Sequence, residues 1–276
     1  MPGSENLIDA AGRRHRVCDG VPRIVSLVPS ITELVCELGL AGNLVGRTGF
    51  CVHPKGVVRG VPKVGGTKTV DLDKIRELAP THVIVNVDEN TRETAAALDA
   101  LVPNLIVTHP LAPMDNVALF RLLGAVFRCG AQAEALVAQF DAAHGRAVAA
   151  RFPPSRRNVL YLIWREPWMT VSRDTYISRA LALVGLDTVP ESTSERYPKI
   201  ELESAAEHAE IVLLSTEPYR FRAKHVAELR SLPSLAGKPV ELVDGELTSW
   251  YGSRAIAGMD YIAALRHRLE LGMQAN

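Results

Sequence analysis

Short apolar runs alternate with amphipathic stretches along the first third of the chain. The apolar runs are rich in β-branched residues and too short for helices, which predicts buried strands. The predicted strands cover 23–28, 44–46, 82–86 and 104–108, and the predicted helices between them cover 31–38, 70–78 and 91–101. Strands that alternate with helices at this spacing are typical of parallel β units, so the sequence predicts an α/β fold.

The first predicted helix carries both a start signal and a stop signal. Ser30 stands where an N-cap is expected and Glu33 follows three residues later, which is the capping-box pattern. Gly39 then marks the end of the helix. We therefore expect Ser30 to cap this helix directly after the carboxyl end of the first strand.

The same order of elements recurs in the second half of the chain. An apolar run at 158–163 repeats the opening strand, and a helix at 175–184 is followed by Gly185, as the first helix is followed by its own glycine. The segment 200–215 then aligns with 70–86 after the deletion of one residue. Such a repeat predicts two related lobes, each with a parallel-type sheet flanked by helices.

Residues 116–152 carry no strand signal but keep a helical period of apolar positions. We expect a pair of helices here, the second ending at Pro153 and Pro154. A helix that joins two lobes is stiff and limits hinge motion. The predicted organisation is an N-terminal α/β lobe over 1–125, a connecting backbone helix over 126–154 and a C-terminal α/β lobe over 155–276.

The amino-acid composition argues against a nucleic-acid partner and against a membrane-spanning segment. Lys plus Arg and Asp plus Glu both number 31, so the basic surplus of a nucleic-acid-binding protein is missing. No run approaches the ~20 apolar residues that cross a bilayer, and the first residues lack the apolar core of a secretory signal. The four cysteines are widely spaced, which fits a reducing compartment. As the chain stands we expect it to be cytoplasmic, or periplasmic if a signal peptide has been removed.

Ligands of parallel α/β sheets bind beyond the carboxyl ends of the strands. All three tryptophans fall at or just after such ends, and Tyr251 is adjacent to one of them. Aromatic walls with a few polar groups suit a large, rigid and partly apolar ligand, whereas packing within cores or between lobes is the alternative role. The residues we expect to contact the ligand are Ser30, Phe50, Cys51, His53, Gly66, Asn86, Glu89, Trp164, Trp168, Tyr219, Trp250 and Tyr251.

Two of these residues are also candidate metal ligands. Cys51 and His53 would offer a thiolate and an imidazole to a soft or borderline metal, but two ligands do not make a closed site. A metal-dependent enzyme or a cytoplasmic sensor built on this pair is one alternative, and an ordinary surface-loop histidine is the simpler interpretation of His53. None of the common catalytic motifs occurs, so we expect no enzymatic activity and no cofactor for catalysis.

Several segments together resemble one known family. The segments are 23–33, 64–67, 71–75, 78–84 and 250–254, with a leading hairpin at 8–13. They are similar to the cobalamin- and ferric-siderophore-type (class III, helical-backbone) substrate-binding proteins of ABC importers, and the similarity covers roughly residues 7–266. The resemblance implies two lobes on one backbone helix, a shallow cleft between them, and a bound corrinoid, ferric siderophore, haem or metal ion.

The resemblance also implies partners. Members of the family are usually monomers and dock to an ABC permease through an acidic residue on each lobe. Residues 52–70 contain no Asp or Glu and carry Lys55, Arg59, Lys63 and Lys68 instead, so we do not expect such docking on the first lobe. Glu201 or Glu203 could serve on the second. We therefore expect a cytoplasmic monomer that holds a small-molecule or metal-chelate ligand without delivering it to a permease. A regulatory module that uses 55–68 as an interface is the remaining alternative.

Overall fold

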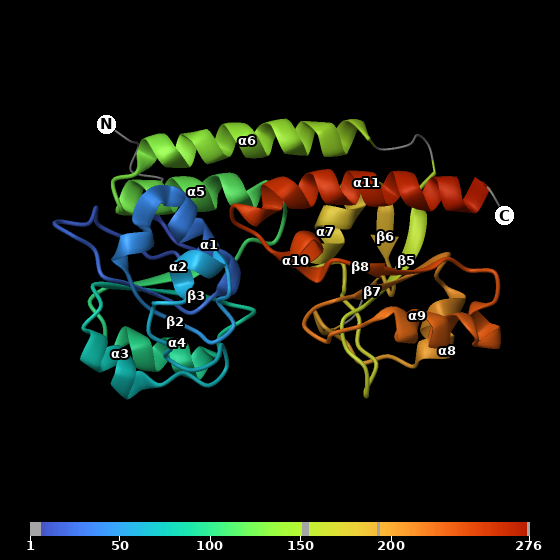
Figure 1. The fold of residues 1–276 in the computed structure, drawn as a ribbon, viewed down its shortest axis with the longest axis horizontal. Helices are drawn as coiled ribbons and strands as arrows, with labels where there is room; N and C mark the ends of the chain where they lie inside the picture. The colour runs from blue at the N-terminus through green and yellow to red at the C-terminus, as the bar shows by residue number, and fades with distance from the viewer. Residues whose placement is uncertain (1–6, 151–154, 192–193, 275–276) are drawn as a thin grey trace. The chain divides into compact units, whose positions relative to one another are not determined.

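The computed structural model describes residues 7–150, 155–191 and 194–274. These residues form two compact units, which are described one at a time (Figure 1). The following ranges make up unit 1: 1–110, 114–140 and 251–254. Unit 2 comprises 111–113, 141–250 and 255–276. Within the described residues, no helix combines the length and the apolar character needed to cross a membrane.

Unit 1 is built on a four-stranded parallel sheet with the strand order β2-β1-β3-β4. Its strands are β1 (Ile24–Ser26), β2 (Leu44–Arg47), β3 (His82–Asn86) and β4 (Leu105–Thr108). Its α-helices are α1 (Pro29–Val35), α2 (Lys55–Val58), α3 (Leu72–Leu78), α4 (Arg92–Asp99) and α5 (Asp115–Val126). A π-helical turn, η2 (Cys36–Leu40), and a 3-10 turn, η3 (Ala41–Asn43), follow α1.

Unit 2 repeats this plan with the strand order β6-β5-β7-β8, again all parallel. Its strands are β5 (Arg157–Leu162), β6 (Leu186–Thr188), β7 (Ile211–Ser215) and β8 (Val240–Val243). Its helices are α7 (Tyr176–Leu183), α8 (Leu202–Glu207), α9 (Ala223–Arg230), η4 (Pro233–Leu235), α10 (Gly245–Ser249) and α11 (Arg254–Gln274), of which α11 begins on the last residue of unit 1.

The internal repeat and the α/β fold class are therefore confirmed. Each strand of unit 1 has a counterpart at the same place in the sheet of unit 2, since β1, β2, β3 and β4 correspond to β5, β6, β7 and β8. The two glycines expected to end the first helix of each half have φ angles of +82° at Gly39 and +79° at Gly185. Glycine adopts this left-handed conformation without the steric cost that other residues carry.

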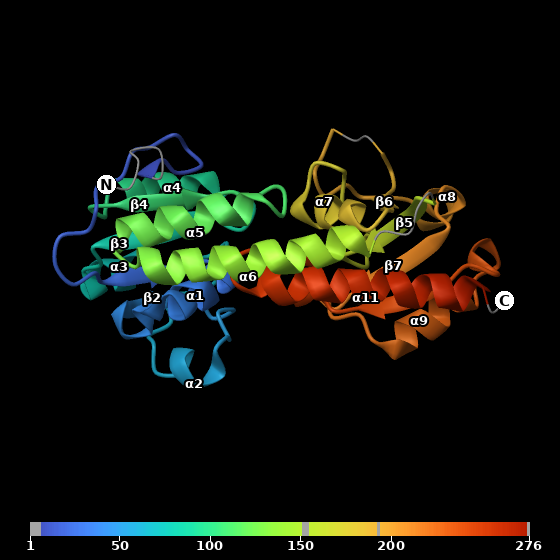
Figure 2. The ribbon, with the colours of Figure 1, turned by 90° about the horizontal axis from the view of Figure 1, so that it is seen from above.

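One face of each sheet is buried against an equivalent pair of helices. In unit 1, α3 and α4 contribute Ile75 and Leu98 to a core with Val83 and Val85 of β3. In unit 2, the residues in the same role are Leu202 of α8, Leu229 of α9, and Val212 and Leu214 of β7. Figure 1 and Figure 2 show α5 on the opposite face in unit 1 and α7 in unit 2. A sheet buried on both faces explains why its central strands β3 and β7 are buried at every position.

The expected capping box at Ser30 is wrong. Helix α1 begins at Pro29, its N-cap is Val28, and no side chain caps it. Proline fits the first helical position because its missing N–H has no partner there in any helix. Ser30 is consequently buried inside the first turn, and Glu33 forms a two-point ion pair with Arg254 at 2.6 and 2.7 Å instead of reaching back to the cap.

Helix α6 (Gly130–Ala149) lies within the range 126–154 where the connecting helix is expected. Its residues up to Phe140 belong to unit 1 and its later residues to unit 2. The expected stop at Pro153 and Pro154 lies outside the described residues. The leading hairpin is present as a tight turn closed by an antiparallel bridge between Ile8 and Arg14.

Replacing Gly65 by alanine should destabilise unit 1. Gly65 has φ +101°, and an added Cβ would lie 2.3 Å from the carbonyl oxygen of Thr69. We expect Gly65→Ala to lower the free energy of unfolding by about 1–3 kcal/mol, measured by urea denaturation. Gly60→Ala is the control, because a Cβ there meets nothing within 4 Å, and it should change stability by less than about 0.5 kcal/mol. Equal effects of the two substitutions would contradict this interpretation.

His82 should make unit 1 sensitive to acid. Burial, and then the charge of His15, lower the pKa of His82 to about 4, while its ring packs edge-on against Phe127 at 4.9 Å. The unfolded chain binds this proton near pH 6.5 and the folded chain only near pH 4, so stability is lost as pH falls through that window. The loss reaches about 3 kcal/mol at one pKa unit per 1.36 kcal/mol. In urea denaturation, His82→Gln should flatten the slope of stability against pH between these values, and an unchanged slope would contradict the assignment.

Candidate ligand-binding site

An aromatic pair marks the carboxyl edge of the sheet in unit 2. Trp164 follows β5 and Tyr219 follows β7, and their rings meet edge to face with centroids 5.6 Å apart. The Trp164 side chain remains 39% exposed, which is unusual for so large an apolar group. Because neighbouring strands β5 and β7 carry these two residues, the parallel sheet itself brings them together.

Trp168 occupies a more structural position than Trp164. Its ring stacks on Phe221 with an interplanar angle of 3° and a centroid distance of 6.1 Å. Trp168 and Tyr219 also pack against the buried core cluster of unit 2. The alternative of core packing therefore applies in part to both residues. Of the two, Tyr219 is the ring that contacts Trp164.

A cation accompanies this aromatic cluster. The guanidinium of Arg165 lies 5.7 Å from the centre of the Trp168 ring and is held by Glu228. Burial lowers the pKa of His225, which packs against Tyr219 with centroids 5.7 Å apart. Arg165 was not among the sequence candidates, although its position between two tryptophans was a signal that it lies at the site. A charged group beside an aromatic wall suits a ligand with peripheral polar or anionic groups.

Trp250 is fixed in unit 2 by a hydrogen bond and by the helix before it. Its indole Nε1–H donates to the Glu217 carboxylate at 3.0 Å. Helix α10, which ends just before Trp250, is tied to the sheet because the buried Tyr161 hydroxyl contacts Thr248 at 2.5 Å and Ser215 at 3.1 Å. The loop after β7 therefore positions both Tyr219 and Trp250. Glu217 was missed from sequence because its partner is 33 residues away.

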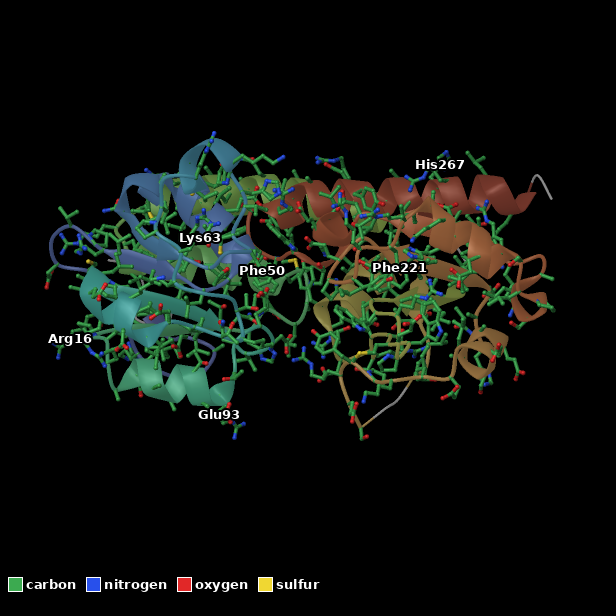
Figure 3. The ribbon with its side chains drawn as sticks, turned by 60° about the horizontal axis from the view of Figure 1, so that its bottom comes forward. Arg16, Phe50, Lys63, Glu93, Phe221 and His267 are labelled. Atoms are coloured by element: carbon green, nitrogen blue, oxygen red, sulfur yellow. The ribbon has the colours of Figure 1, made fainter. Side chains whose placement is uncertain are left out.

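In unit 1, Phe50 is the exposed aromatic group at the carboxyl edge. It follows β2, and its side chain is 64% exposed (Figure 3). Gly66 lies beneath it, since a Cβ built on Gly66 would come within 3.4 Å of the Phe50 ring. The Gly49 N–H donates to Gly65 O at 2.7 Å and joins the two loops. The structure thus brings together two sequence candidates that are 16 positions apart.

Cys51 and His53 do not meet the requirements of a metal centre. The Cys51 side chain is fully buried, its sulfur lies 3.1 Å from the Thr48 hydroxyl, and burial raises the pKa of its thiol. A metal binds the thiolate, so a raised pKa works against ligation. Among the described residues, no group of three or more His, Cys, Asp or Glu side chains could hold a metal ion. All four cysteines are free, and burial also raises the pKa of the other three thiols, Cys18, Cys36 and Cys129.

Two other candidates are buried. Asn86 is 2% exposed, and its amide donates to Thr108 O at 3.0 Å while its oxygen accepts from the Asp88 N–H at 2.8 Å. It shapes the loop after β3. Ser30 is equally buried, within the first turn of α1. In this structure neither side chain is open to a ligand, although the loops they support carry Glu89 and the start of α1.

Tyr251 and Glu89 form a polar pair within unit 1. The Tyr251 hydroxyl donates to Glu89 Oε1 at 3.2 Å. Burial raises the pKa of Tyr251 well above its usual value, and the negative charge of Glu89 adds to this effect. The residue after Tyr251, Gly252, donates its N–H to Asn116 Oδ1 at 2.6 Å. The segment 251–254 is thus held in unit 1 by hydrogen bonds that bridge more than a hundred residues of sequence.

Two parallel α/β units of the same strand order, each with aromatic residues at the carboxyl edge where ligands of such sheets bind, are typical of two-domain binding proteins. A family model described as periplasmic binding protein matches residues 24–237. The chain therefore belongs to the periplasmic binding protein family. No curated protein matches the sequence significantly.

Solved structures of this class are similar along almost their whole length. The heme-binding protein RhuT from Roseiflexus sp. RS-1 is 21% identical with a TM-score of 0.78, and the match covers 91% of this chain and 99% of that one. The vitamin B12 binding protein BtuF of Vibrio cholerae is 16% identical with a TM-score of 0.77 and coverages of 90% and 98%. The heme-binding protein HutB of Vibrio cholerae is 20% identical with a TM-score of 0.74 and coverages of 89% and 99%. At these identities the likeness establishes the fold.

Two of the six tyrosines should resist ionisation in the folded protein. Burial raises the pKa of Tyr161 to about 12 and that of Tyr251 well above its usual value. In an alkaline titration followed by tyrosinate absorbance, Tyr161→Phe and Tyr251→Phe should leave the absorbance change below about pH 11 unaltered. In guanidinium chloride each variant should lose the signal of one tyrosine, which is the control. A loss in the folded protein by Tyr251→Phe would show that this hydroxyl is open to solvent.

Proposed function

We propose that this protein is a substrate-binding protein for a bulky macrocyclic metal chelate, either a corrinoid or a haem, and that it performs no catalysis. The observation that carries the proposal is the partly exposed Trp164, whose ring contacts Tyr219. The next residue in the chain, Arg165, holds its guanidinium over the Trp168 ring and supplies a cation to the same loop. A flat apolar ring system with peripheral polar groups fits such an edge, because its face can contact the indole while its rim contacts the cation.

The solved relatives support the chemical class of the ligand. RhuT and HutB are heme-binding proteins, and BtuF is a vitamin B12 binding protein. Both are large, rigid metal chelates. On this chain, the exposed ring of Phe50 above Gly66 offers unit 1 an apolar contact of the same kind as Trp164 offers unit 2.

Docking to an ABC permease in this family is expected to use an acidic residue on each lobe, and unit 1 does not offer one in the corresponding segment. In the segment 52–70, Lys55, Arg59, Lys63 and Lys68 are all exposed and no carboxylate is present. A basic surface here would repel a basic docking pocket. On unit 2, Glu201 and Glu203 are exposed at the start of α8, and the proposed docking role falls to them.

Replacing Trp164 by alanine should weaken ligand binding by about 2 kcal/mol, which is roughly a 30-fold rise in Kd. Cyanocobalamin and hemin are the two ligands to titrate, with binding read from calorimetry so that loss of the fluorophore does not interfere. Trp250→Ala should act in the same direction, since its indole is held at the same loop. Leu271→Ala is the control, because this residue of α11 is exposed and packs no aromatic of the site.

Trp168→Ala needs a stability measurement beside it, because its ring stacks on Phe221 and its loss disturbs the core as well. Saturable binding of one ligand with weakened Trp164 and Trp250 variants would support the proposal. Unchanged binding by all three tryptophan variants would mean that the carboxyl edge of unit 2 is not the site. No binding of either chelate would overturn the proposed ligand class.

A further inference from the structure

The edge strands β4 and β8 differ in whether another part of the chain covers their outward-facing backbone groups. In unit 1, β4 is an edge strand, and the backbone of Val107 faces away from the sheet. The N-terminal turn covers it: the Val107 N–H donates to Asp9 Oδ2 at 3.0 Å, and Val107 O accepts from the Ala10 N–H at 3.0 Å. An edge strand with unpaired backbone groups is a template for pairing, and this turn closes it.

The equivalent backbone position of unit 2 is Leu242. Val107 stands opposite Val85 in β3, and Leu242 stands opposite Leu214 in β7, at the same place in the repeated sheet. The ladder to β7 uses the carbonyls of Pro239 and Val243, so the intervening even-numbered residues face outward. Within the described residues, no hydrogen bond reaches the Leu242 N–H or C=O, and its side chain is 37% exposed.

The open edge borders a hollow of about 420 Å³ between β8 and α9. Val226 and Ala227 of α9 and Val240 and Leu242 of β8 give it an apolar floor, and Arg230 stands at its rim. The Arg230 guanidinium donates to Val240 O at 2.8 Å, which draws the cation to the edge of the strand. The hollow therefore offers room for side chains beside the unpaired backbone groups.

Beside the edge strand, unit 2 carries the cation Arg230 where unit 1 carries the carboxylate Asp99. Leu98 of α4 and Leu229 of α9 are equivalent core residues, so Asp99 and Arg230 occupy equivalent positions. In unit 1, Asp99 forms a two-point ion pair with Arg13 of the covering turn. A segment that covers β8 in the same way would meet the cation of Arg230 at the position of Asp99, and Glu241 of β8 also lines the hollow.

We propose that the outer edge of β8 binds an acidic peptide segment of a partner protein, which pairs with Leu242 as the N-terminal turn pairs with Val107 and places a carboxylate on Arg230. Main-chain hydrogen bonds to a sheet edge give such binding its affinity, and the neighbouring pocket and charge give it selectivity. This site is separate from the carboxyl edge proposed for the chelate, because it lies along the side of the sheet.

A peptide made from the chain's own covering turn provides the test. Fluorescently labelled residues 7–16 with Arg13→Glu and Arg14→Glu form the acidic probe, and the unaltered residues 7–16 form the basic probe. Fluorescence anisotropy with the full-length protein should show the acidic probe binding at least about 10-fold more tightly, because of the carboxylate on Arg230. Hydrogen exchange should slow at the amide of Leu242 when the acidic probe is added.

Two variants separate the charge from the backbone. Arg230→Glu should invert the preference so that the basic probe binds more tightly, and Arg268→Glu, the same charge change on an exposed arginine of α11, should leave the preference unaltered. Leu242→Pro removes the outward N–H without breaking the ladder to β7 and should weaken both probes. A thermal melt of each variant establishes that it is folded.

Three results would overturn the proposal. The first is that wild-type protein binds neither probe, and the second is that Arg230→Glu leaves the order of the probes unaltered. The third is a concentration-dependent dimer that Leu242→Pro abolishes, because a second copy would then occupy the edge in place of an acidic partner. Binding of the acidic probe with inversion by Arg230→Glu would support it.

Discussion

Parallel pairing of four short strands is the constraint on which both units depend. Parallel strands place every carboxyl end at one edge of the sheet, so loops that are far apart in sequence converge there. Trp164 and Tyr219 are 55 positions apart and yet meet at 5.6 Å, because β5 and β7 are hydrogen-bonded neighbours. The same pairing leaves the faces of the sheet to helices, which is why the two central strands of each sheet are mostly apolar in their middle positions.

Aromatic residues at these ends have two roles that compete. Trp168 and Phe221 stack to close the core of unit 2, and Tyr219 packs against the same cluster. A ring that seals a core is held rigid and loses little conformational freedom when a ligand arrives, which favours binding. Such a ring also has less exposed surface with which to contact a ligand. Trp164 differs from these rings because it meets Tyr219 edge to face and remains 39% exposed.

The fold could be predicted from sequence in most of its elements because the signals are local. An apolar run predicted β3 to the residue, and the recurring order of strands and helices predicted the repeat. Ser30 was misplaced because the sequence pattern for a capping box is short, and Pro29 satisfied the helix start first. The candidate site was harder. Arg254 pairs with Glu33 across 221 positions and Trp250 with Glu217 across 33, and no periodicity reports such distances. Cys51 was placed correctly in a loop, but only the packing around it shows that its thiol is buried.

The partial or full burial of the four cysteines affects how readily their thiols are oxidised. Thiol oxidation and disulfide exchange proceed through the thiolate, and burial raises the pKa of each of these thiols, to about 11 for Cys36. At neutral pH the thiolate fraction is therefore below that of an ordinary cysteine, and Cys51 is also sealed from solvent. A smaller thiolate fraction slows reaction with dissolved oxidants. Free cysteines of this kind are compatible with oxidising as well as reducing surroundings, so their wide spacing does not decide the compartment.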